Sequence, residues 1–385
     1  MFFIILQKKH KQVFTNIKLY VIILLYKKEG ALNLSNIYLV IDLKTFFASV
    51  ECAERGLDPF TTNLVVADPN RGNGSVCLAI TPAMKKLGIR NRCRVYEIPK
   101  NVKYIMAVPR MSKYMEYSAN IYGIYLKYIS KDDIYPYSID ECFIDVTHYL
   151  KLYKMNAMEL AKVMMKDILD TYKITATCGI GNNMYLAKVA LDILSKHSLT
   201  NIAWLNEEKY IKTLGNHKPL TDFWGIGKGT AERLKKMGIF TMKEIARCDE
   251  KRLYKEFGIN ARFLIDHSKG LETCTIADVK EYKPKTTSYS NSQILFKDYN
   301  YENARLIVKE MVELLSQKLI ENNKKAGVVR LYIGYSKDAI KSTGGSRKLA
   351  NPSNLYTNLV FEFMKLFDQT TDKDTPIRKV RNKFW

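Results

Sequence analysis

Short apolar runs that carry acidic residues dominate the hydrophobic pattern in the first half of the chain. The run Tyr38–Leu43 is apolar except for Asp42, and the run Tyr137–Asp145 holds Asp140 and Glu141 side by side. An apolar run of about four to eight residues predicts a buried strand, and neighbouring side chains on a regular strand point to opposite faces. Asp140 and Glu141 can therefore serve one site only if the backbone turns or bulges between them.

The remaining pattern up to residue 200 alternates between strand and helix periods. We expect strands at 37–45, 64–67, 75–80 and 173–181, a strand hairpin at 135–146, and helices at 46–55, 82–88, 112–129, 158–171 and 185–195. Strands and helices mixed in this way predict an α+β fold, with an antiparallel sheet and helices on one face.

From about 200 to 272 the pattern predicts helices only, with a glycine-rich turn between two of them. Gly225, Gly227, Lys228, Gly229 and Thr230 make up this turn. Glycines let another backbone approach closely, and free amides at a helix N-terminus can bind a DNA phosphate. The turn predicts a helix–hairpin–helix that grips DNA; the alternative is an ordinary turn between helices.

A polar linker at 273–285 precedes a second pattern of strands and helices. We expect a strand at 286–296, a helix at 301–322, strands at 327–335 and 341–348, and a helix at 354–367, which make up most of a βαββαβ unit. The last strand would begin at Thr375 and stop short at Trp385. A short last strand predicts a sheet that is frayed at one edge.

The charge balance points to a polyanionic partner. The formal net charge is +22, from 61 basic and 39 acidic residues, and the segment from Lys283 to Lys348 alone carries 13 basic and six acidic residues. Such an excess favours nucleic acid over a membrane surface as the partner. A solvated basic surface is the alternative for the segment taken alone. The seven cysteines form no CxxC pair, so we interpret them as reduced thiols of a cytoplasmic protein.

Residues 1–36 differ in composition from the rest of the chain. They are rich in lysine, and their apolar run Leu19–Tyr26 is too short to span a bilayer. Lys27, Lys28 and Glu29 follow that run where a signal peptide would have its small cleavage-site residues. We interpret the segment as an extension that activity does not require, with an interfacial amphipathic helix as the alternative.

Asp42, Asp140 and Glu141 are the candidate catalytic residues. Burying several negative charges is costly unless a divalent cation compensates them. Carboxylates at the ends of two strands therefore predict a two-metal phosphoryl-transfer centre. The alternative is that Asp140 and Glu141 lie in a solvated hairpin turn and that Asp42 caps a helix.

With these motifs the chain resembles the Y-family translesion DNA polymerases of the UmuC/DinB type, on the UmuC side, from about Tyr38 to Val380. The matching motifs are Val40–Asp42 with Phe46–Glu51, Ser138–Glu141, Cys178–Asn183 with Leu186–Lys188, and Trp224–Gly227. The resemblance implies a template-directed polymerase that extends a primer 3′ end opposite damaged template as part of the SOS response. Its partners would be primer–template DNA, deoxynucleoside triphosphates and a sliding clamp, with no membrane.

The resemblance also implies a right-hand fold with an antiparallel palm sheet, small fingers, a helical thumb that holds the helix–hairpin–helix, and a βαββαβ little finger. The implied boundaries are a non-family extension at 1–36, the palm at 37–45 and 110–200, the fingers at 46–109, the thumb at 201–272, the linker at 273–285 and the little finger at 286–385.

Residue roles follow from the resemblance by position. Asp42, Asp140, Glu141 and the Leu43 carbonyl would bind two Mg²⁺ ions. Phe47, next to Phe46, would lie against the sugar and exclude a 2′-hydroxyl, and Lys188 would contact the triphosphate. Thr81 and Lys85 are further candidates for the triphosphate, in a region where the family often has Tyr and Arg and this chain has Pro82 and Lys85. A lysine keeps the positive charge but loses the two-pronged guanidinium.

Two other functions fit part of the pattern. A nucleotidyl cyclase also uses strand-end carboxylates and two metal ions, but it needs neither a helix–hairpin–helix nor a basic C-terminal domain. A catalytically weakened DNA-binding relative would keep the carboxylates for structure alone.

Overall fold

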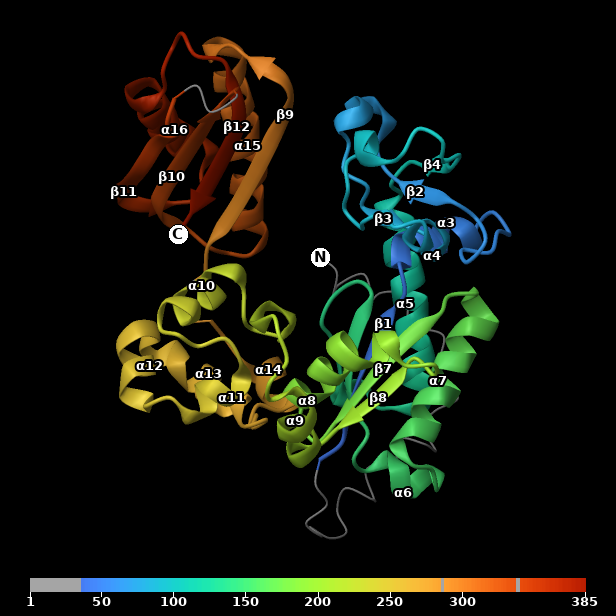
Figure 1. Ribbon diagram of the computed structural model, residues 1–385. Coiled ribbons are helices and arrows are strands. Elements are labelled where there is room, and N and C mark those ends of the chain that lie inside the picture. Colours follow the sequence, from blue (N-terminus) through green and yellow to red (C-terminus); the bar gives the residue numbers. More distant parts are fainter. Residues whose placement is uncertain (1–35, 285–286, 337–339) are drawn as a thin grey trace. The chain divides into compact units, whose positions relative to one another are not determined.

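A computed structural model describes residues 36–284, 287–336 and 340–385. The chain divides into a first unit, Met1–Tyr282, and a second unit, Lys283–Trp385, whose elements are labelled in Figure 1. Of the predicted extension 1–36, all but Asn36 lies outside the described residues. Within the described ranges, no helix is both long and apolar enough to cross a membrane.

The first unit contains two sheets and a set of mostly short helices. Its strands are β1 (Tyr38–Leu43), β2 (Leu64–Val66), β3 (Ala79–Ile80), β4 (Ile105–Ala107), β5 (Ile134–Pro136), β6 (Glu141–Asp145), β7 (Ala176–Gly181) and β8 (Ile202–Leu205). Its α-helices are α3 (Phe46–Ala53), α4 (Pro82–Lys86), α5 (Met111–Tyr128), α6 (Tyr149–Tyr153), α7 (Ala157–Tyr172), α8 (Met184–Val189), α9 (Glu207–Leu214), α10 (Lys228–Lys236), α11 (Met242–Arg247), α12 (Glu250–Phe257), α13 (Ala261–Ser268) and α14 (Ile276–Glu281). The strand orders are β5-β6-β1-β7-β8 and β3-β2-β4.

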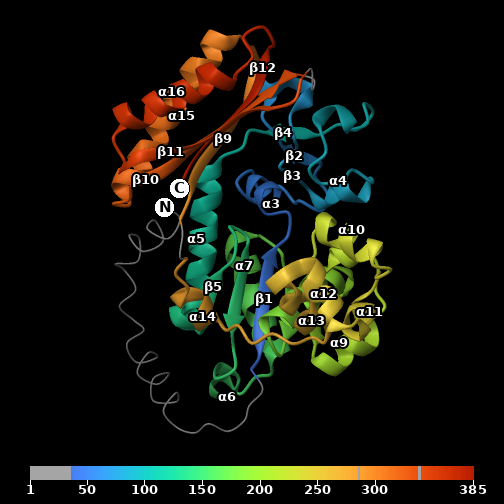
Figure 2. The ribbon, with the colours of Figure 1, turned by 90° about the vertical axis from the view of Figure 1, so that its left-hand side faces the viewer.

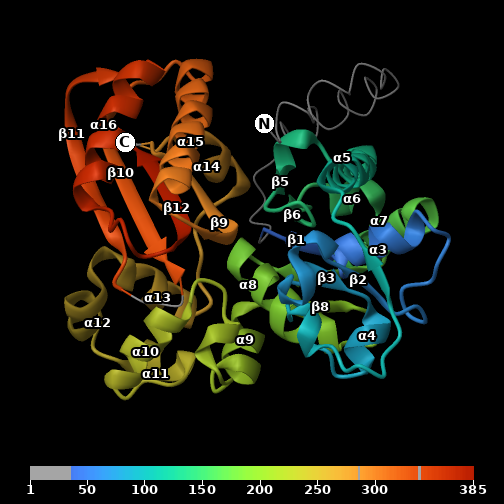
Figure 3. The ribbon, with the colours of Figure 1, turned by 90° about the horizontal axis from the view of Figure 1, so that it is seen from above.

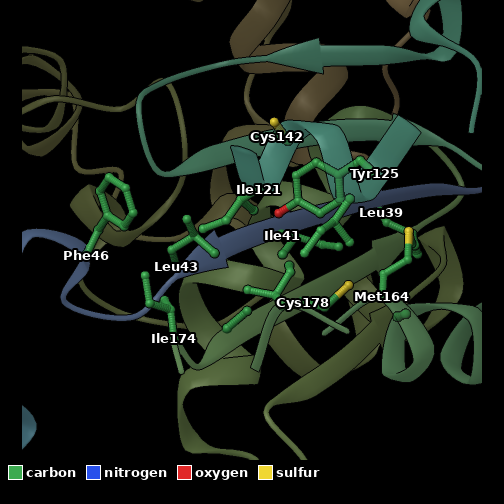
Figure 4. Close-up of a cluster of buried hydrophobic side chains, with 14 of the residues drawn as sticks. Leu39, Ile41, Leu43, Phe46, Ile121, Tyr125, Cys142, Met164, Ile174 and Cys178 are labelled. Carbon is green, nitrogen blue, oxygen red and sulfur yellow. The ribbon is translucent and has the colours of Figure 1, made fainter. Parts of the chain in front are cut away.

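Strand β1 lies at the centre of the five-stranded sheet because it is apolar on both faces. Leu39 and Ile41 point into a core that α5 and α7 close, as Figure 4 shows with Tyr125 and Met164. On the other face, Val40 and its neighbours pack against α8 and α14. Helices therefore cover both faces, and the prediction of helices on one face is wrong. A one-sided sheet needs polar side chains along its solvent face, and β1 has none before Asp42.

The sheet also includes a strand where helices alone were predicted. Strand β8 pairs in parallel with β7, for example Cys178 with Ile202. The sheet is thus mainly, but not wholly, antiparallel, and it extends past the predicted palm boundary at residue 200. Four residues are too few for a period to be recognised in the sequence.

In the three-stranded sheet β3-β2-β4, strands β2 and β3 lie beside α3, as Figure 3 shows. The predicted strand 75–80 is regular only at Ala79–Ile80, and β4 was not predicted. Buried residues of this region form a small core of their own around Val65, Ile80 and Met84.

The segment predicted as a linker at 273–285 is in large part the helix α14. Ile276 is buried beside Tyr38 and Val40 of β1, and the Lys280 ammonium donates to the Asp132 carbonyl at 3.0 Å. The segment was predicted to be a linker because most of its residues are polar, but its one buried apolar residue, Ile276, begins a helix. The boundary between the two units therefore falls after α14, at Tyr282.

The second unit is a four-stranded antiparallel sheet covered on one face by two helices. Its elements are β9 (Tyr289–Tyr299), α15 (Tyr301–Glu321), β10 (Ala326–Tyr335), β11 (Thr343–Ser353), α16 (Tyr356–Thr370) and β12 (Ile377–Phe384). Figure 2 shows α15 and α16 side by side on the sheet, whose strand order is β11-β10-β12-β9. The βαββαβ order predicted from the sequence is therefore complete.

The prediction that the last strand stops short and leaves a frayed edge is wrong. Strand β12 lies inside the sheet and pairs with β10 on one side and β9 on the other. The pairing continues to the last residue, because the Trp385 amide donates to the Val328 carbonyl at 3.0 Å. Strands of about five or six residues are common in sheets, so the eight residues of β12 suffice.

Because β12 is central, its side chains should dominate the stability of the second unit. Phe384 is fully buried and its ring meets Phe363 edge-on at 5.4 Å between centroids. Phe384→Ala should lower the free energy of unfolding of this unit by about 3–5 kcal/mol in a urea titration. Phe361→Ala, at a position 56% exposed on α16, is the matched control and should have little effect. Equal effects of the two changes would contradict the central place of β12.

Candidate active site

The pairing of β1 with β6 brings two acidic residues together at one end of the sheet. Asp42 lies directly opposite Glu141 in the antiparallel register, so both side chains project from the same face. The Leu43 amide donates to the Asp140 carbonyl at 2.9 Å, which ties the end of β1 to the residue before β6.

Asp140 belongs to the turn between β5 and β6. The Ser138 hydroxyl donates to Asp140 Oδ1 at 2.7 Å, and the Tyr137 amide donates to the Glu141 carbonyl at 2.9 Å. The predicted turn between the two carboxylates is therefore confirmed, because Asp140 precedes the strand that Glu141 begins. Asp42 does not cap the next helix, whose N-cap is Thr45.

Burial and neighbouring negative charge alter the acidity of Asp42. Burial, with added repulsion from Asp140 and Glu141, raises the pKa of Asp42 to about 7, and attraction to Lys196 and Lys188 offsets only part of this rise. At neutral pH Asp42 is therefore only partly ionised.

Helix α8 reaches the carboxylates because it packs unusually close to β7. A Cβ on Gly179 would lie 2.1 Å from the Ala187 carbonyl oxygen, and one on Gly181 would lie 2.3 Å from the Ala187 nitrogen. Neither contact is possible for a larger residue, which explains the two glycines physically. The close approach brings Lys188, the next residue on α8, over Glu141.

Lys188 is the nearest positive charge to Glu141. Its ammonium lies 2.7 Å from Glu141 Oε1 and 3.0 Å from Asp192 Oδ2, and its side chain is 9% exposed. Burial alone would lower the pKa of Lys188, but the two carboxylates outweigh burial and raise it. Lys188 thus neutralises Glu141 in the described structure, and its predicted contact with a triphosphate stays a prediction.

The acidic residues are of the chemical type that binds a divalent ion, but their side chains are not arranged as a metal site. Carboxylate and carbonyl oxygens are the ligands that Mg²⁺ prefers. Among the described residues, however, no three acidic, histidine or cysteine side chains form a ready-made metal cluster. Glu141 Oε1 is paired with the Lys188 ammonium at 2.7 Å. A metal ion that used this oxygen would have to displace the lysine.

An open pocket of about 650 Å³ adjoins the carboxylates. Asp42, Leu43 and Asp140 line it at the sheet end, and Phe46 and Phe47 of α3 line it on another side. The rest of its lining includes the cationic residues Lys44, Lys85, Lys86, Arg92 and Lys196. An acidic end, an aromatic wall and several cations suit a metal-bound nucleotide triphosphate.

The structure changes the list of candidate nucleotide-binding residues at Thr81 and at Lys196. Thr81 is fully buried and does not line the pocket. Its hydroxyl donates to the Thr62 carbonyl at 2.8 Å and accepts from the Leu64 amide at 3.1 Å, so its role is structural. Sequence reasoning missed Lys196, which lies near Asp42 because the chain beyond α8 folds back toward β1. The only sequence signal was its spacing of eight from Lys188.

The backbone of the predicted hairpin at 225–230 is open to contact by another molecule. Gly225 has a φ of +88°, which favours glycine, and Gly227 begins α10 without a side-chain cap. A Cβ on Gly227 or Gly229 would meet nothing within 4 Å. Helix α10 follows a single 3-10 turn rather than a full first helix. The exposed start of α10, which includes Lys228 and Thr230, therefore offers uncapped amides.

Comparisons with known proteins agree with this geometry. A solved structure of a Y-family DNA polymerase chimera, Dbh-Dpo4(243-245)-Dbh, superposes with a TM-score of 0.71 over 90% of this chain and 98% of the chimera, at 19% identity. DNA polymerase IV 2 of Bacillus subtilis (strain 168) is 31% identical over 357 residues, or 89% of this chain and 82% of the relative. UvrX of the same bacterium, which carries the name of a UV-damage repair protein, is 32% identical over 85% of this chain and 76% of the relative.

The fold is therefore the right-hand fold of the Y-family polymerases. A model described as the impB/mucB/samB family matches residues 41–192, and the model of that family's C-terminal domain matches residues 286–383. With relatives above 30% identity along most of its length, the chain belongs to the impB/mucB/samB family. The resemblance to UmuC/DinB-type polymerases is confirmed.

The raised pKa of Asp42 predicts a pH-dependent cost to stability. An unfolded Asp has a pKa near 4 and the folded Asp42 one of about 7, so its contribution to stability is complete below the unfolded value and is lost as the pH rises to the folded value. In EDTA at about pH 8, the free energy of unfolding of Asp42→Asn should exceed that of the wild type by on the order of 4 kcal/mol, measured in a denaturant titration. Near pH 4 the difference should vanish. Asp170→Asn, on the exposed end of α7, is the control. A gain that does not depend on pH would contradict the assigned cause.

Proposed function

We propose that this protein is a template-directed DNA polymerase of the error-prone translesion type, which adds deoxynucleotides to a primer 3′ end opposite damaged template. One observation carries the proposal: in a chain of this family, Asp42 and Asp140 line one pocket with several cationic side chains. Phosphoryl transfer is mainly positioning and charge stabilisation, which such a pocket supplies. A nucleotidyl cyclase would need no basic track for DNA.

Asp42, Asp140, Glu141 and the Leu43 carbonyl would hold two Mg²⁺ ions. When bound, the ions would lower the pKa of the primer 3′-hydroxyl and offset the charge of the leaving pyrophosphate. The high pKa of Asp42 supports this assignment, because burial and the neighbouring carboxylates disfavour its negative charge and a bound cation would stabilise that charge. Lys188 would release Glu141 on metal binding and keep its second partner, Asp192.

The nucleotide would lie along the cationic side of the pocket. Lys85 and Lys196 would contact the triphosphate, since both line the pocket that Asp42 closes. Lys188 is a further candidate once it has left Glu141. Phe47, next to Phe46, would lie under the sugar and exclude a 2′-hydroxyl.

The DNA would be held through its backbone at two places. One is the start of α10, where Gly225, Gly227, Lys228, Gly229 and Thr230 present an uncapped helix end. The other is the face of the second unit's sheet that its helices leave open. A hollow of about 390 Å³ in that face is lined by Arg330, Tyr332, Lys379, Arg381 and Lys383. Contacts to phosphates hold DNA in register without reading its sequence.

The cysteines bear on the cellular compartment. The seven cysteines are all free, five of them buried, which supports the reducing environment of the cytoplasm. A role in the SOS response and recruitment by a sliding clamp stay predictions from the family.

The metal-binding carboxylates give the first test. Asp140→Asn should lower primer extension about a thousandfold or more, because the transition state loses several kcal/mol of charge stabilisation. Its affinity for primer–template DNA should stay close to that of the wild type. Asp132→Asn, at an exposed position before β5, is the control. Wild-type protein that fails to extend primers on either an undamaged or an abasic template would contradict the polymerase proposal, and a cyclase assay on the same preparation would test the alternative.

The basic face of the second unit gives the second test. Arg381→Gln should weaken binding equally on unrelated DNA sequences and reduce the slope of log affinity against log salt by about 0.9, the value for one phosphate contact. Lys318→Gln removes an equal charge from α15, on the other side of the sheet, and should change neither quantity. A loss confined to one DNA sequence would contradict backbone binding at this face.

A further inference from the structure

A fully buried carboxylate lies directly behind the aromatic wall of the pocket. Glu51 is on α3, four residues after Phe47, and has no exposed surface. Arg110 donates to it twice, from Nε and Nη2, each at 2.9 Å. The Tyr114 hydroxyl donates to Glu51 Oε1 at 2.8 Å, and the Arg55 guanidinium contacts Oε2. A buried carboxylate with three donors is a fixed point in the structure.

The charge of Glu51 is stable at any working pH. Burial alone would raise the pKa of Glu51, but hydrogen bonds from Arg110, Arg55 and Tyr114 outweigh burial and lower it. Burial raises the pKa of Tyr114, and its bond to Glu51 adds to the rise, so its hydroxyl keeps its proton. The Tyr114–Glu51 hydrogen bond therefore persists while the enzyme works.

The ring of Tyr114 is the surface against which Phe47 rests. The two rings stack with centroids 4.5 Å apart and an angle of 17° between their planes. Tyr114 is itself fully buried on α5. Its hydroxyl is held by Glu51 at one end and its Cα by the helix at the other. The ring therefore has little freedom to rotate or tilt.

Phe47 has no comparable anchor of its own. Its Cα is fixed by α3, but its ring is only partly buried and faces the pocket. Aromatic rings turn about their last torsion in a broad energy well. Its other aromatic neighbour, Phe46, lies farther away, with centroids 5.9 Å apart and planes tilted by 48°. The closer, nearly parallel stack with Tyr114 therefore constrains the angle of the Phe47 ring most.

We propose that Tyr114, anchored by Glu51, is a positioning residue for Phe47 and thereby sets how strictly the pocket excludes nucleotides that carry a 2′-hydroxyl. The inference rests on the proposed polymerase function and on Phe47 lying under the sugar. A displacement of about 1 Å in a site can change a rate about a hundredfold. A Phe47 ring that can tilt away would admit the extra hydroxyl.

The same two helices provide a matched control. Tyr117, three residues after Tyr114 on α5, donates its hydroxyl to Glu54 Oε1 at 2.8 Å. Glu54 follows Glu51 by three residues, but this second pair is exposed and the Tyr117 ring packs edge-on against Tyr172. The Tyr117–Glu54 pair therefore has the same kind of hydrogen bond as Tyr114–Glu51, but the Tyr117 ring packs on Tyr172 and not on Phe47.

The test measures kcat/KM for a ribonucleotide and for the matching deoxynucleotide with the full chain on undamaged primer–template. Tyr114→Leu removes the stack and should raise the ratio of ribo- to deoxyribonucleotide use about tenfold. Tyr114→Phe keeps the ring and loses its anchor, so it should raise the ratio about two- to threefold. Tyr117→Leu should leave the ratio unchanged, even if it costs some stability.

Phe47→Ala and the double variant Phe47→Ala/Tyr114→Leu show whether Tyr114 acts through Phe47. Phe47→Ala should raise the ratio more than either Tyr114 variant, and adding Tyr114→Leu to it should cause no further rise, because residues that act as one unit are not additive. A multiplied effect in the double variant would overturn the inference.

The remaining outcomes separate this inference from the proposed function. An unchanged ratio in Phe47→Ala would remove Phe47 from the sugar and with it the premise of the inference. A raised ratio in Phe47→Ala, with an unchanged ratio in both Tyr114 variants, would overturn the inference and leave the polymerase function standing. If Tyr114→Leu fails to fold, Tyr114→Phe decides, because it keeps the buried ring, and an unchanged ratio in it overturns the inference.

Discussion

The antiparallel register that sets Asp42 opposite Glu141 is the constraint on which the site depends. It concentrates negative charge at one end of a sheet that is otherwise buried on both faces. Unpaired charge in such a place is unstable, so the neighbouring elements supply cations. Lys188 meets Glu141 from α8, and Lys196 approaches Asp42 from beyond that helix. Burial, with repulsion from Asp140 and Glu141, keeps the pKa of Asp42 raised despite these cations.

Two largely buried carboxylates, Glu51 and Glu141, have pKa values shifted in opposite directions. Glu51 has three donors, a lowered pKa and no route to the pocket. Glu141 has a single cationic partner and a raised pKa, to which burial contributes most. Glu51 is thus fixed by several hydrogen bonds, whereas Glu141 has one ion pair, to Lys188.

Local sequence patterns predicted those parts of the fold that depend on nearest neighbours. The apolar runs of β1 and β6, the helices α5 and α7, and the βαββαβ order of the second unit follow from period and composition. Patterns failed for elements whose stability comes from distant partners. Strand β8 is stabilised by pairing with the edge of β7, and α14 by the packing of Ile276 against β1. Strand β12 was predicted to stop short at Trp385, but β10 and β9, which lie far away in sequence, pair with it on both sides.

The sequence by itself determined which chemistry is available: three carboxylates, two aromatic residues at the start of α3, and a large excess of positive charge. Motif spacing also determined the family. Only the tertiary structure decided how these groups act, because direction and distance arise from pairing and packing between remote segments. It placed Thr81 in the core rather than the pocket, joined Lys188 to Glu141, and stacked Phe47 on Tyr114. No periodicity along the chain encodes those three contacts.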